Sequence, residues 1–502
     1  MANDLEVDVV VVGVGLAGAS AAIEASDGGA EVLAIERFNV GGSSAMSGGI
    51  IYAAGTEHQR ASGFEDSAEG MFRYLESVVE RPSVSPETLH RFCAESNANL
   101  MWLEEQGVPF AEGFWPYKTS NPPPGFGLYY SGSELCAPYR DASPPAPRGH
   151  KPVGDKSLPT AGLAGRANFT GYVTMWHLQD AMTARGIQIR TNTAVGGLVD
   201  DDGRVTGVQC SSDSDGPSVV RARRGVVLAT GGFQADRDLV VRNNALFAAL
   251  PPLGPASSDG EGIRLGQGVG GAVAFMNEFL ASVSVPADAL LYGIMIGPSG
   301  SRVTNERLYI GALGDEVIKA HNGRAWLVAD DDIYAAAMAE AAEYGGEIDP
   351  NVAERLALDG HAVGDTVEAL ADGLGLSPSA VAYSVGRYNR QIARHQPDDL
   401  GKDDDFRRPI VRPPFHAFEC SPRAFTSLGG LVVDEGSGRV VRPDGDPIEG
   451  LCAAGRTAVG VCGTARTYHS GLSLSDCVFS GRRAGRYLAH GLRSPGSGRG
   501  GP

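Results

Sequence analysis

One stretch near the N-terminus constrains the fold more than any other part of this chain. Residues 7–12 are five valines and one aspartate, and the turn 13–18 then reads Gly-Val-Gly-Leu-Ala-Gly. A small, alanine-rich run covers 19–25, and an apolar stretch over 32–35 ends at Glu36. The order of strand, glycine turn, helix, strand and acid is typical of a unit that binds a dinucleotide. A buried unit of the same type without a ligand is the alternative.

Single residues of this unit have distinct tasks. Gly13 supplies the dihedral angles that a tight turn needs, and Gly15 lets backbone amides approach a diphosphate. Gly18 lets the helix pack closely on the sheet, while the helix N-terminus faces the negative charge. Glu36 stands where a carboxylate can accept hydrogen bonds from both hydroxyls of a ribose.

A second glycine-rich stretch, residues 41–49, reads Gly-Gly-Ser-Ser-Ala-Met-Ser-Gly-Gly. It is too polar and flexible for a core segment. Its small side chains and free amides suit close passage along a diphosphate and the edge of an isoalloxazine ring. A plain loop is the alternative. Because the stretch directly follows a nucleotide-binding unit, it favours a flavin over a nicotinamide, since a flavin needs a second cradle.

Length and composition bound the class of protein. The 502 residues, 42% of them hydrophobic, suffice for two or three domains. A formal net charge of −18 argues against a nucleic-acid or anionic-membrane partner. We expect neither a signal segment nor a transmembrane helix, because no apolar stretch has the necessary length. Seven cysteines without paired spacing indicate reduced thiols in the cytoplasm and no metal site.

The middle of the chain combines regular patterns with one long irregular segment. Apolar spacing predicts helix over 65–107 and again over 170–185. Between them, residues 108–165 are rich in proline, glycine and aromatics, which indicates either a lid or ligand wall, or a surface insertion. A hairpin is expected over 198–208. The buried strand 226–233 runs into a glycine turn, as strands do when they return to a nucleotide-binding sheet.

The later part of the chain changes pattern and then returns to it. Residues 258–262 open a helix, in which Asp259 is either the N-cap or a cofactor contact. Nucleotide-type signals resume at 428–434, and the glycine-rich loop 465–476 opens an arginine-rich helix whose N-terminus would stabilise an anionic reduced flavin. The Gly/Ser/Pro-rich tail 491–502 is predicted to be disordered. Further elements are expected between these points, a strand at 325–328 and helices at 332–344, 364–376 and 378–395.

A series of motifs along the chain identifies a family resemblance. The motifs are the turn 13–18 with Glu36, Gly41-Gly42-Ser43-Ser44, Ala229-Thr230-Gly231-Gly232-Phe233, Ser258-Asp259-Gly260, Asn305-Glu306 and Gly450-Leu451-x-Ala453-Ala454-Gly455. In this order they resemble the fumarate reductase/succinate dehydrogenase flavoprotein superfamily. The resemblance covers roughly 5–488, apart from the proline-rich segment, and implies FAD. It also implies an α/β fold, with a Rossmann-like FAD-binding domain at 1–255 and 421–490 and an inserted α+β cap (substrate) domain at 256–420.

Details of these motifs separate the chain from enzymes that act on dicarboxylates. Fumarate reductases of the superfamily carry a histidine before the late glycine pair, whereas residues 425–430 read Phe-Thr-Ser-Leu-Gly-Gly. The Ala-Ala-Gly that usually precedes a glutamate is followed here by Arg456. The flavin-linking histidine of succinate dehydrogenases is absent from 43–46, so we expect noncovalent FAD.

Motifs near the C-terminus narrow the subfamily. They are Ala453-Ala454-Gly455-Arg456, Gly460-Val461-Cys462, Tyr468-x-Ser470-Gly471-x-Ser473-Leu474 and Gly481-Arg482-Arg483-Ala484-Gly485. These motifs resemble the 3-ketosteroid dehydrogenases, most of all the 4-ene-forming type for 5α-reduced steroids. The resemblance implies a catalytic cap tyrosine, matched by Tyr309, and a catalytic Tyr-x-Ser beside the flavin, matched by Tyr468 and Ser470. It further implies a small apolar, steroid-like ketone as substrate, with an electron acceptor that no motif names.

The chemistry of such a reaction fits these side chains. Desaturation next to a ketone removes a proton from the alpha carbon and transfers a hydride from the beta carbon to the flavin. A hydrogen bond to the ketone oxygen acidifies the alpha proton, so that a tyrosinate suffices as base although free tyrosine titrates near roughly 10. Tyr468 and Ser470 would act as carbonyl donor, or as base and relay, and Tyr309 would take part in proton transfer. Core aromatics with satisfied hydroxyls are the alternative for both tyrosines.

The sequence therefore predicts a site and an activity. The residues expected to bind FAD are Gly13, Gly15, Leu16, Ala17, Gly18, Glu36, Arg37, Gly42, Ser43, Ser44, Met46, Gly48, Gly49, Val195, Thr230, Gly231, Asp259, Gly455, Arg456, Ser473 and Leu474. The predicted activity is that of a 3-ketosteroid dehydrogenase. Two other functions remain open at this point: a flavin-dependent reductase of an activated C=C bond in a fumarate-like or secondary-metabolite substrate, and a flavin-carrying assembly subunit without turnover.

Overall fold

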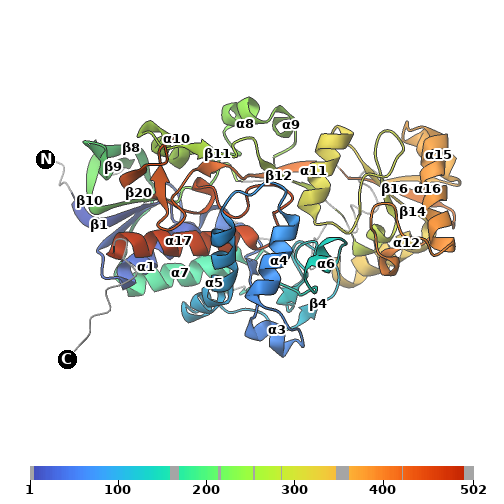
Figure 1. The fold of residues 1–502 in the computed structure, drawn as a ribbon, viewed down its shortest axis with the longest axis horizontal. Helices are drawn as coiled ribbons and strands as arrows, with labels where there is room; N and C mark the ends of the chain where they lie inside the picture. Colours follow the sequence, from blue (N-terminus) through green and yellow to red (C-terminus); the bar gives the residue numbers. More distant parts are fainter. Residues whose placement is uncertain are drawn as a thin grey trace.

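The computed structural model of the chain describes residues 5–155, 157–158, 169–212, 216–252, 255–283, 285, 287–345, 361–420 and 422–490. The molecule is elongated, with helices and strands in both ends (Figure 1). The mixed α/β class expected from the sequence is confirmed. The tail 491–502, predicted to be disordered, lies outside the described residues.

A sheet with a parallel centre forms one end of the molecule. The parallel strands are β1 (Leu5–Val12), β2 (Val32–Ile35), β7 (Gln188–Arg190), β10 (Gly216–Leu228) and β20 (Pro447–Ala453). Val12 pairs with both Ile35 and Leu228, and Leu228 pairs with Ala453, so the carboxyl ends of four strands meet along one edge. In an open α/β sheet, ligands bind at this edge.

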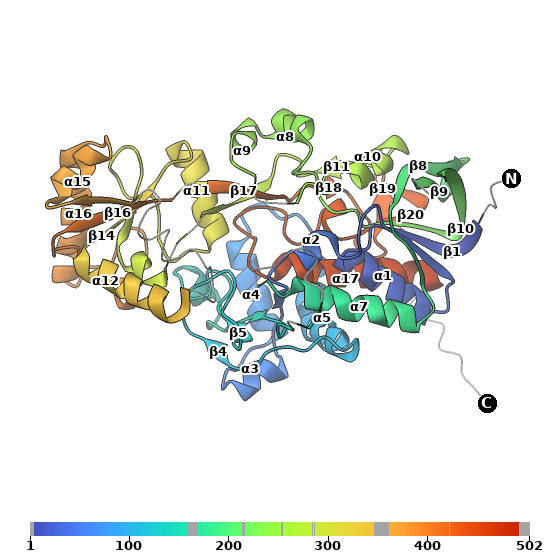
Figure 2. The same cartoon turned by 180° about the vertical axis from the view of Figure 1, so that it is seen from behind.

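Two antiparallel elements and three helices complete this end. The predicted hairpin is present as β8 (Thr193–Asp201) and β9 (Arg204–Ser212), which continue the sheet, and β19 (Arg439–Val441) pairs with β20. The helices α1 (Leu16–Asp27), α7 (Gly171–Ala184) and α17 (Leu472–His490) lie side by side against the sheet (Figure 2). Val9 and Val11 are completely buried under α1, which explains why β1 is nearly all valine.

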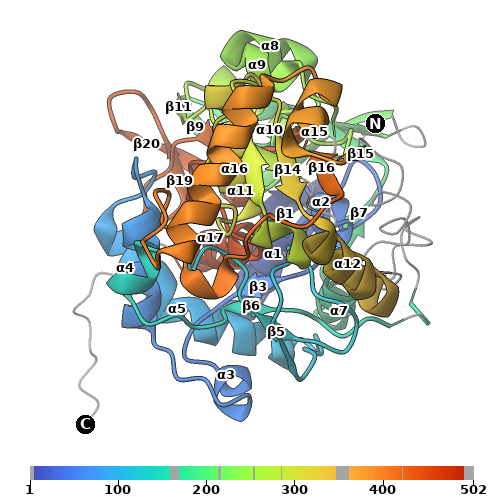
Figure 3. The ribbon, with the colours of Figure 1, turned by 90° about the vertical axis from the view of Figure 1, so that its right-hand side faces the viewer.

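A second sheet occupies the far end. It is antiparallel, in the order β13 (Ile294–Ile296), β14 (Trp326–Ala329), β16 (Phe415–Glu419) and β15 (His361–Gly364). Viewed from that end, the helices lie around this sheet (Figure 3). They are α11 (Ile310–His321), α12 (Asp331–Glu340), α15 (Val367–Gly373) and α16 (Pro378–Ala393). Two strands, β12 (Phe279–Val283) and β17 (Pro422–Ser427), form an antiparallel pair that connects the two ends.

The proline-rich segment is part of the body of the protein. Its short strands β4 (Phe114–Trp115), β5 (Leu128–Tyr129) and β6 (Gly149–His150) form a sheet with β3 (Ile51–Tyr52). Trp115 and Tyr129 are buried, and Ser120 and Asn121 line a cavity of about 570 Å³. Of the two interpretations of 108–165, a ligand wall is therefore the one that the described part supports.

The remaining helices cover this region and the edges of the sheets. They are α2 (Gly42–Ala45), α3 (Glu57–Ala61), α4 (Ala68–Val78), α5 (Pro86–Glu105), α6 (Tyr139–Ala142), α8 (Arg237–Asn243), α9 (Ala245–Ala248) and α10 (Glu261–Gly268). The small pair β11 (Val273–Ala274) and β18 (Gly430–Leu431) packs beside α10. Within the described residues, no helix is long and apolar enough to span a membrane, and no group of metal-binding side chains is found. All seven cysteines are buried, and among the described residues none forms a disulfide.

Candidate functional site

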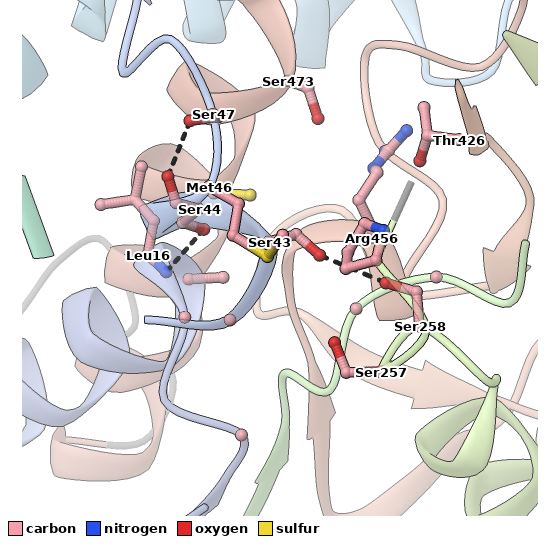
Figure 4. A pocket seen from close by; sticks show the side chains of 18 of the residues that line it. Leu16, Ser43, Ser44, Met46, Ser47, Ser257, Ser258, Thr426, Arg456 and Ser473 are labelled. Atoms are coloured by element: carbon pink, nitrogen blue, oxygen red, sulfur yellow. Dashed lines mark hydrogen bonds between the residues drawn. The ribbon is translucent and has the colours of Figure 1, made fainter. Parts of the chain in front are cut away.

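A cavity of about 570 Å³ lies at the edge where the parallel strands end. Its wall includes the last residues of β1 and β2, the turn 229–232 after β10, the loop 42–50, the N-terminal turn of α17 and residues of the far end of the molecule. A close view shows loops of separate segments facing one another across it (Figure 4). The cavity has the position and size of a ligand site in this class of fold.

Glycines make the first turn of this cavity possible. Gly13 has a φ of +92°, and a Cβ there would lie 2.5 Å from the carbonyl oxygen of Ala229. A Cβ on Gly18 would lie 1.9 Å from the carbonyl oxygen of Gly13, so only glycine allows α1 to approach the turn. Gly13 and Gly15 line the cavity, whereas Gly18 stands behind them as a packing residue.

Glu36 is fixed by backbone amides at the end of β2. One carboxylate oxygen accepts a hydrogen bond from the N–H of Val14 at 2.8 Å, and the other accepts from the N–H of Phe38 at 3.0 Å. Each oxygen has a further lone pair for a ligand hydroxyl. Glu36 lines the cavity, in the position that the sequence predicts for a ribose contact.

Serines of the second glycine stretch join this turn to the opposite wall. The N–H of Leu16 donates to Ser44 Oγ at 3.1 Å, and the hydroxyls of Ser43 and Ser258 are 3.2 Å apart across the cavity (Figure 4). A Cβ added to Gly42 would meet nothing within 4 Å, so the backbone is bare on the cavity side. The stretch 41–49 therefore contributes to the cavity wall, and part of it is the short helix α2.

Asp259 is not the helix N-cap. That position belongs to Gly260, whose φ of +79° disfavours a side chain. The Asp259 carboxylate accepts the N–H of Glu261 at 3.3 Å and pairs with the Arg37 guanidinium at 2.7 Å. Arg37 and Asp259 thus connect two sides of the cavity wall.

Most of the residues expected to bind the cofactor line the cavity. The exceptions are Gly18 and Gly455. Gly455 has a φ of +60° and lies between α1 and α17, where a Cβ would come within 2.8 Å of Ala17 Cβ. It borders a smaller cavity of about 160 Å³. Helix packing requires a glycine at position 455, so the motif at 453–456 indicates that the backbone closely approaches α1 and α17 there.

The two tyrosines and the serine of the predicted catalytic set come together. The rings of Tyr309 and Tyr468 are 6.2 Å apart and nearly parallel, and both line the cavity with Ser470. Burial raises the pKa of Tyr468, opposed by the charge of Arg456, and burial raises the pKa of Tyr309 well above its usual value, opposed by the Ser470 hydroxyl. Both phenols are therefore protonated near neutral pH and can donate hydrogen bonds.

Residues that the sequence did not single out support this set. The Tyr129 hydroxyl lies 2.9 Å from Ser470 Oγ, and Ser470 Oγ donates to the carbonyl oxygen of Ser120 at 2.7 Å. His469 Nε2 is 2.7 Å from the Tyr74 hydroxyl, and its ring packs 5.8 Å from that of Tyr309. Burial lowers the pKa of His469 to about 4, so it is neutral. The only signal for Tyr129 was the aromatic content of the irregular segment.

Arg456 offers a test of whether a flavin fits. It lies in the cavity wall near Thr426 (Figure 4), and its Nη2 is 3.5 Å from the Asp476 carboxylate. Among the described residues, its Nε and Nη2 have no hydrogen-bond partner. Bare glycine backbone and a helix N-terminus in the cavity wall suit a ligand with a diphosphate. These residues fit FAD.

Comparison with known proteins agrees with this geometry. A family model described as "FAD binding domain" matches residues 8–472. The chain is 33% identical over 505 residues to 3-oxo-5-alpha-steroid 4-dehydrogenase of Comamonas testosteroni, which covers 89% of this chain and 92% of that protein. It is 26% identical over 500 residues to fumarate reductase (cytochrome) of Shewanella frigidimarina, covering 96% of this chain and 77% of the relative.

A solved structure shares the whole fold. It is the crystal structure of 3-ketosteroid-delta4-(5alpha)-dehydrogenase from Rhodococcus jostii RHA1 in complex with 4-androstene-3,17-dione, with a TM-score of 0.87, 34% identity and 97% coverage of both chains. The family resemblance inferred from the motifs is confirmed, and so is FAD as the cofactor. The chain belongs to the FAD binding domain family of flavoproteins, in which 3-oxo-5-alpha-steroid 4-dehydrogenase is its relative.

Proposed function

We propose that this protein is a FAD-dependent dehydrogenase that introduces a double bond next to the ketone of a 3-ketosteroid. The observation that carries the proposal is the convergence of three hydroxyls, from Tyr309, Tyr468 and Ser470, on one cavity whose other end is a dinucleotide cradle. The similarity to a 3-oxosteroid dehydrogenase over nine-tenths of both chains supports the same reaction class.

The proposed division of labour follows the two ends of the molecule. A Rossmann-like domain at 1–255 and 421–490 would bind FAD, and the inserted domain at 256–420 would act as a cap over the substrate. Leu265 packs in the same core as β1 and β20, whereas the second core lies mainly between Val283 and Cys420. Within the range 256–420, α10 thus stays with the FAD-binding domain.

The diphosphate would lie against the amides at the start of α1, and Glu36 would take the ribose. Ser43, Ser44 and Arg456 would contact the remaining polar groups of FAD. Bound FAD supplies the acceptor for the hydride that leaves the beta carbon. No covalent link to the protein is proposed, because 43–46 contain no histidine.

Hydroxyl groups of the protein itself would take part in removing the proton from the alpha carbon. A phenol that is neutral at rest donates to the ketone oxygen and thereby acidifies the alpha carbon. The second tyrosine, ionised by loss of its own proton to water, accepts the alpha proton and returns to the neutral phenol. It lies beside the Ser470 hydroxyl, which contacts Tyr129 and Ser120. Arg456 favours the ionised form of Tyr468, and Ser470 favours that of Tyr309. Single Phe variants of the two tyrosines assign the roles.

Product analysis tests this function. The holoenzyme is incubated with a saturated 3-ketosteroid and a quinone-like electron acceptor, and we expect a product that is lighter by one hydrogen pair. Deuterium at the beta carbon should slow reduction of the flavin, because that atom leaves as hydride, whereas deuterium at the alpha carbon leaves as a proton. Reduction of an added enone without any desaturation of the ketone would favour the reverse activity instead.

A further inference from the structure

The segment 118–133 contacts both halves of the proposed catalytic set. On one side, Ser131 O accepts the N–H of Ser470 at 3.0 Å. On the other side, Ser133 Oγ accepts the N–H of Tyr309 at 2.9 Å, and the Lys118 ammonium donates to the carbonyl oxygen of Leu308. One segment of the irregular region therefore connects the C-terminal loop with the loop in front of α11.

The contacts of Lys118 and Ser133 end on the same peptide group. The C=O of Leu308 and the N–H of Tyr309 belong to one peptide unit, which is planar. Holding both ends of that plane fixes its rotation, and Tyr309 follows it with a φ of −56° and a ψ of 144° directly before α11. The direction of the Tyr309 Cα–Cβ bond is then set relative to Ser470, which the same segment holds.

The surroundings of Lys118 favour this contact, and its ammonium also lies 3.5 Å from the carbonyl oxygen of Glu306. Its own N–H donates to Asp288 Oδ1 at 2.9 Å, and Arg307 Nη1 pairs with that oxygen at 2.7 Å. Lys118 is half-buried beside Arg307, Asp288, Glu134 and Cys136. Burial lowers the pKa of Lys118 to about 7, so the ammonium is costly to hold and the Leu308 carbonyl is a strong partner. Ser133 is buried as well.

We propose that Lys118 and Ser133 are positioning residues for the dehydrogenase reaction, which hold the peptide group before Tyr309 so that its phenol faces Ser470 and Tyr468. The inference rests on the proposed function. A displacement of a reacting group by about 1 Å can cost up to about 10²-fold in rate. Neither residue lines the cavity, and both bind the peptide group before Tyr309, so we expect their effect to pass through the backbone.

Lys118 and Ser133, which hold the peptide group before Tyr309, are called the clamp here. A double-mutant cycle in the FAD-loaded enzyme tests its role. We expect Lys118→Met to lower kcat on a saturated 3-ketosteroid about 10- to 100-fold with little change in KM or FAD content, and Lys118→Arg to restore part of it. In a Tyr309→Phe background, Lys118→Met should cause less than about a twofold further loss, because its target is already gone. An equal loss in both backgrounds, or no loss in the wild type, overturns the proposal. Ser133→Ala is expected to follow the same pattern and replaces Lys118→Met if that variant does not fold.

A second readout separates this inference from the proposed function. Amide hydrogen exchange at Tyr309 should accelerate about tenfold or more in Lys118→Met and Ser133→Ala. It should stay unchanged in the control Lys319→Met, which removes an exposed lysine of α11 paired with Asp315. Full activity of Tyr309→Phe would contradict the role of Tyr309 in catalysis, while the exchange data would still test the clamp. Unchanged exchange in both clamp variants overturns the inference.

Discussion

The two ends of the cavity are built on different principles. The cofactor end comes largely from residues 13–49, and it presents backbone amides, bare glycines and short hydroxyls. The substrate end joins three segments that are far apart in the sequence, around Tyr129, Tyr309 and Tyr468, and it presents buried phenols. One end depends on the path of the main chain, whereas the other depends on side-chain hydroxyls held by tertiary contacts.

This difference predicts that substitutions at the two ends of the cavity impair different properties of the protein. A change in the glycine turn should remove the cofactor or the fold, because the atoms that matter there are main-chain atoms. A change in a phenol should leave cofactor and fold in place and remove turnover, because only one hydroxyl is lost.

The largest effect is expected from Gly13→Val. A Cβ at this position would lie 2.5 Å from Ala229 O, in a backbone conformation with φ of +92°. We expect destabilisation by more than about 4 kcal/mol and a protein without bound flavin, measured from the flavin absorbance and the melting temperature. Gly29→Ala is the control, since its φ is +82° but nothing lies within 4 Å of the added Cβ. Retention of the yellow colour in Gly13→Val would show that the turn tolerates a side chain.

Tyr468→Phe should break the other end alone. Loss of an acid–base hydroxyl costs about 10²–10⁴-fold in kcat, with flavin content and melting temperature close to those of the wild type. Turnover is measured with a saturated 3-ketosteroid. Tyr130→Phe is the matched control, because this half-buried tyrosine packs against Phe64 and Phe114 instead. Normal turnover of Tyr468→Phe would remove it from the mechanism.

Two buried histidines outside residues 13–49 should make the stability depend on pH. Burial lowers the pKa of His469 and of His150 to about 4, whereas a histidine in the unfolded chain titrates near roughly 6.5. Between these values the unfolded state binds more protons, so the stabilisation is present above about pH 6.5 and is lost as pH falls toward 4. Each histidine should cost about 3 kcal/mol at the low end.

Melting temperatures measured from neutral pH down to about pH 4 test this expectation. His469→Gln should flatten the dependence by about half, and the exposed His90→Gln should leave it unchanged. Residues 13–49 contain no histidine, so this stretch adds no histidine titration to the pH dependence of stability. An unaltered pH dependence in His469→Gln would mean that this ring is accessible to protons in the folded state.

The smallest effect is expected from Arg37→Met. Arg37 and Asp259 are each about one-third exposed, with side-chain exposures of 34% and 33%, and a pair of this kind contributes below about 1 kcal/mol. Flavin fluorescence titration of the apoenzyme should show FAD affinity lowered less than about fivefold. A loss of two orders of magnitude would contradict this small contribution of Arg37 to FAD binding.

The cofactor end could be anticipated in detail because its signals are local. Gly13, Gly15 and Glu36 lie close together in the chain, and their spacing alone specifies the turn and the strand that follows. Gly18 and Gly455 were grouped with the cofactor contacts, yet they pack behind the wall. Sequence spacing does not distinguish a glycine that faces a ligand from one that lets two backbones approach.

At the substrate end, the sequence predicted only those residues that belong to a family motif. Tyr468, Ser470 and Tyr309 matched such motifs, but Tyr129 and Lys118 lie in a segment without any apolar period, so their partners depend on tertiary folding. The sequence also gave no helix at 310–321, where α11 begins directly after Tyr309. The buried His469 was not predicted, because one histidine in a sequence does not reveal whether it is buried.

The most direct test of the account is anaerobic mixing of the oxidised holoenzyme with a saturated 3-ketosteroid while the yellow flavin band is followed. The account predicts rapid bleaching in the wild type, and bleaching slowed by about 10²-fold or more in Tyr468→Phe with its full complement of FAD. Bleaching of that variant at the wild-type rate, or a wild-type band that the ketone leaves unchanged, would contradict it.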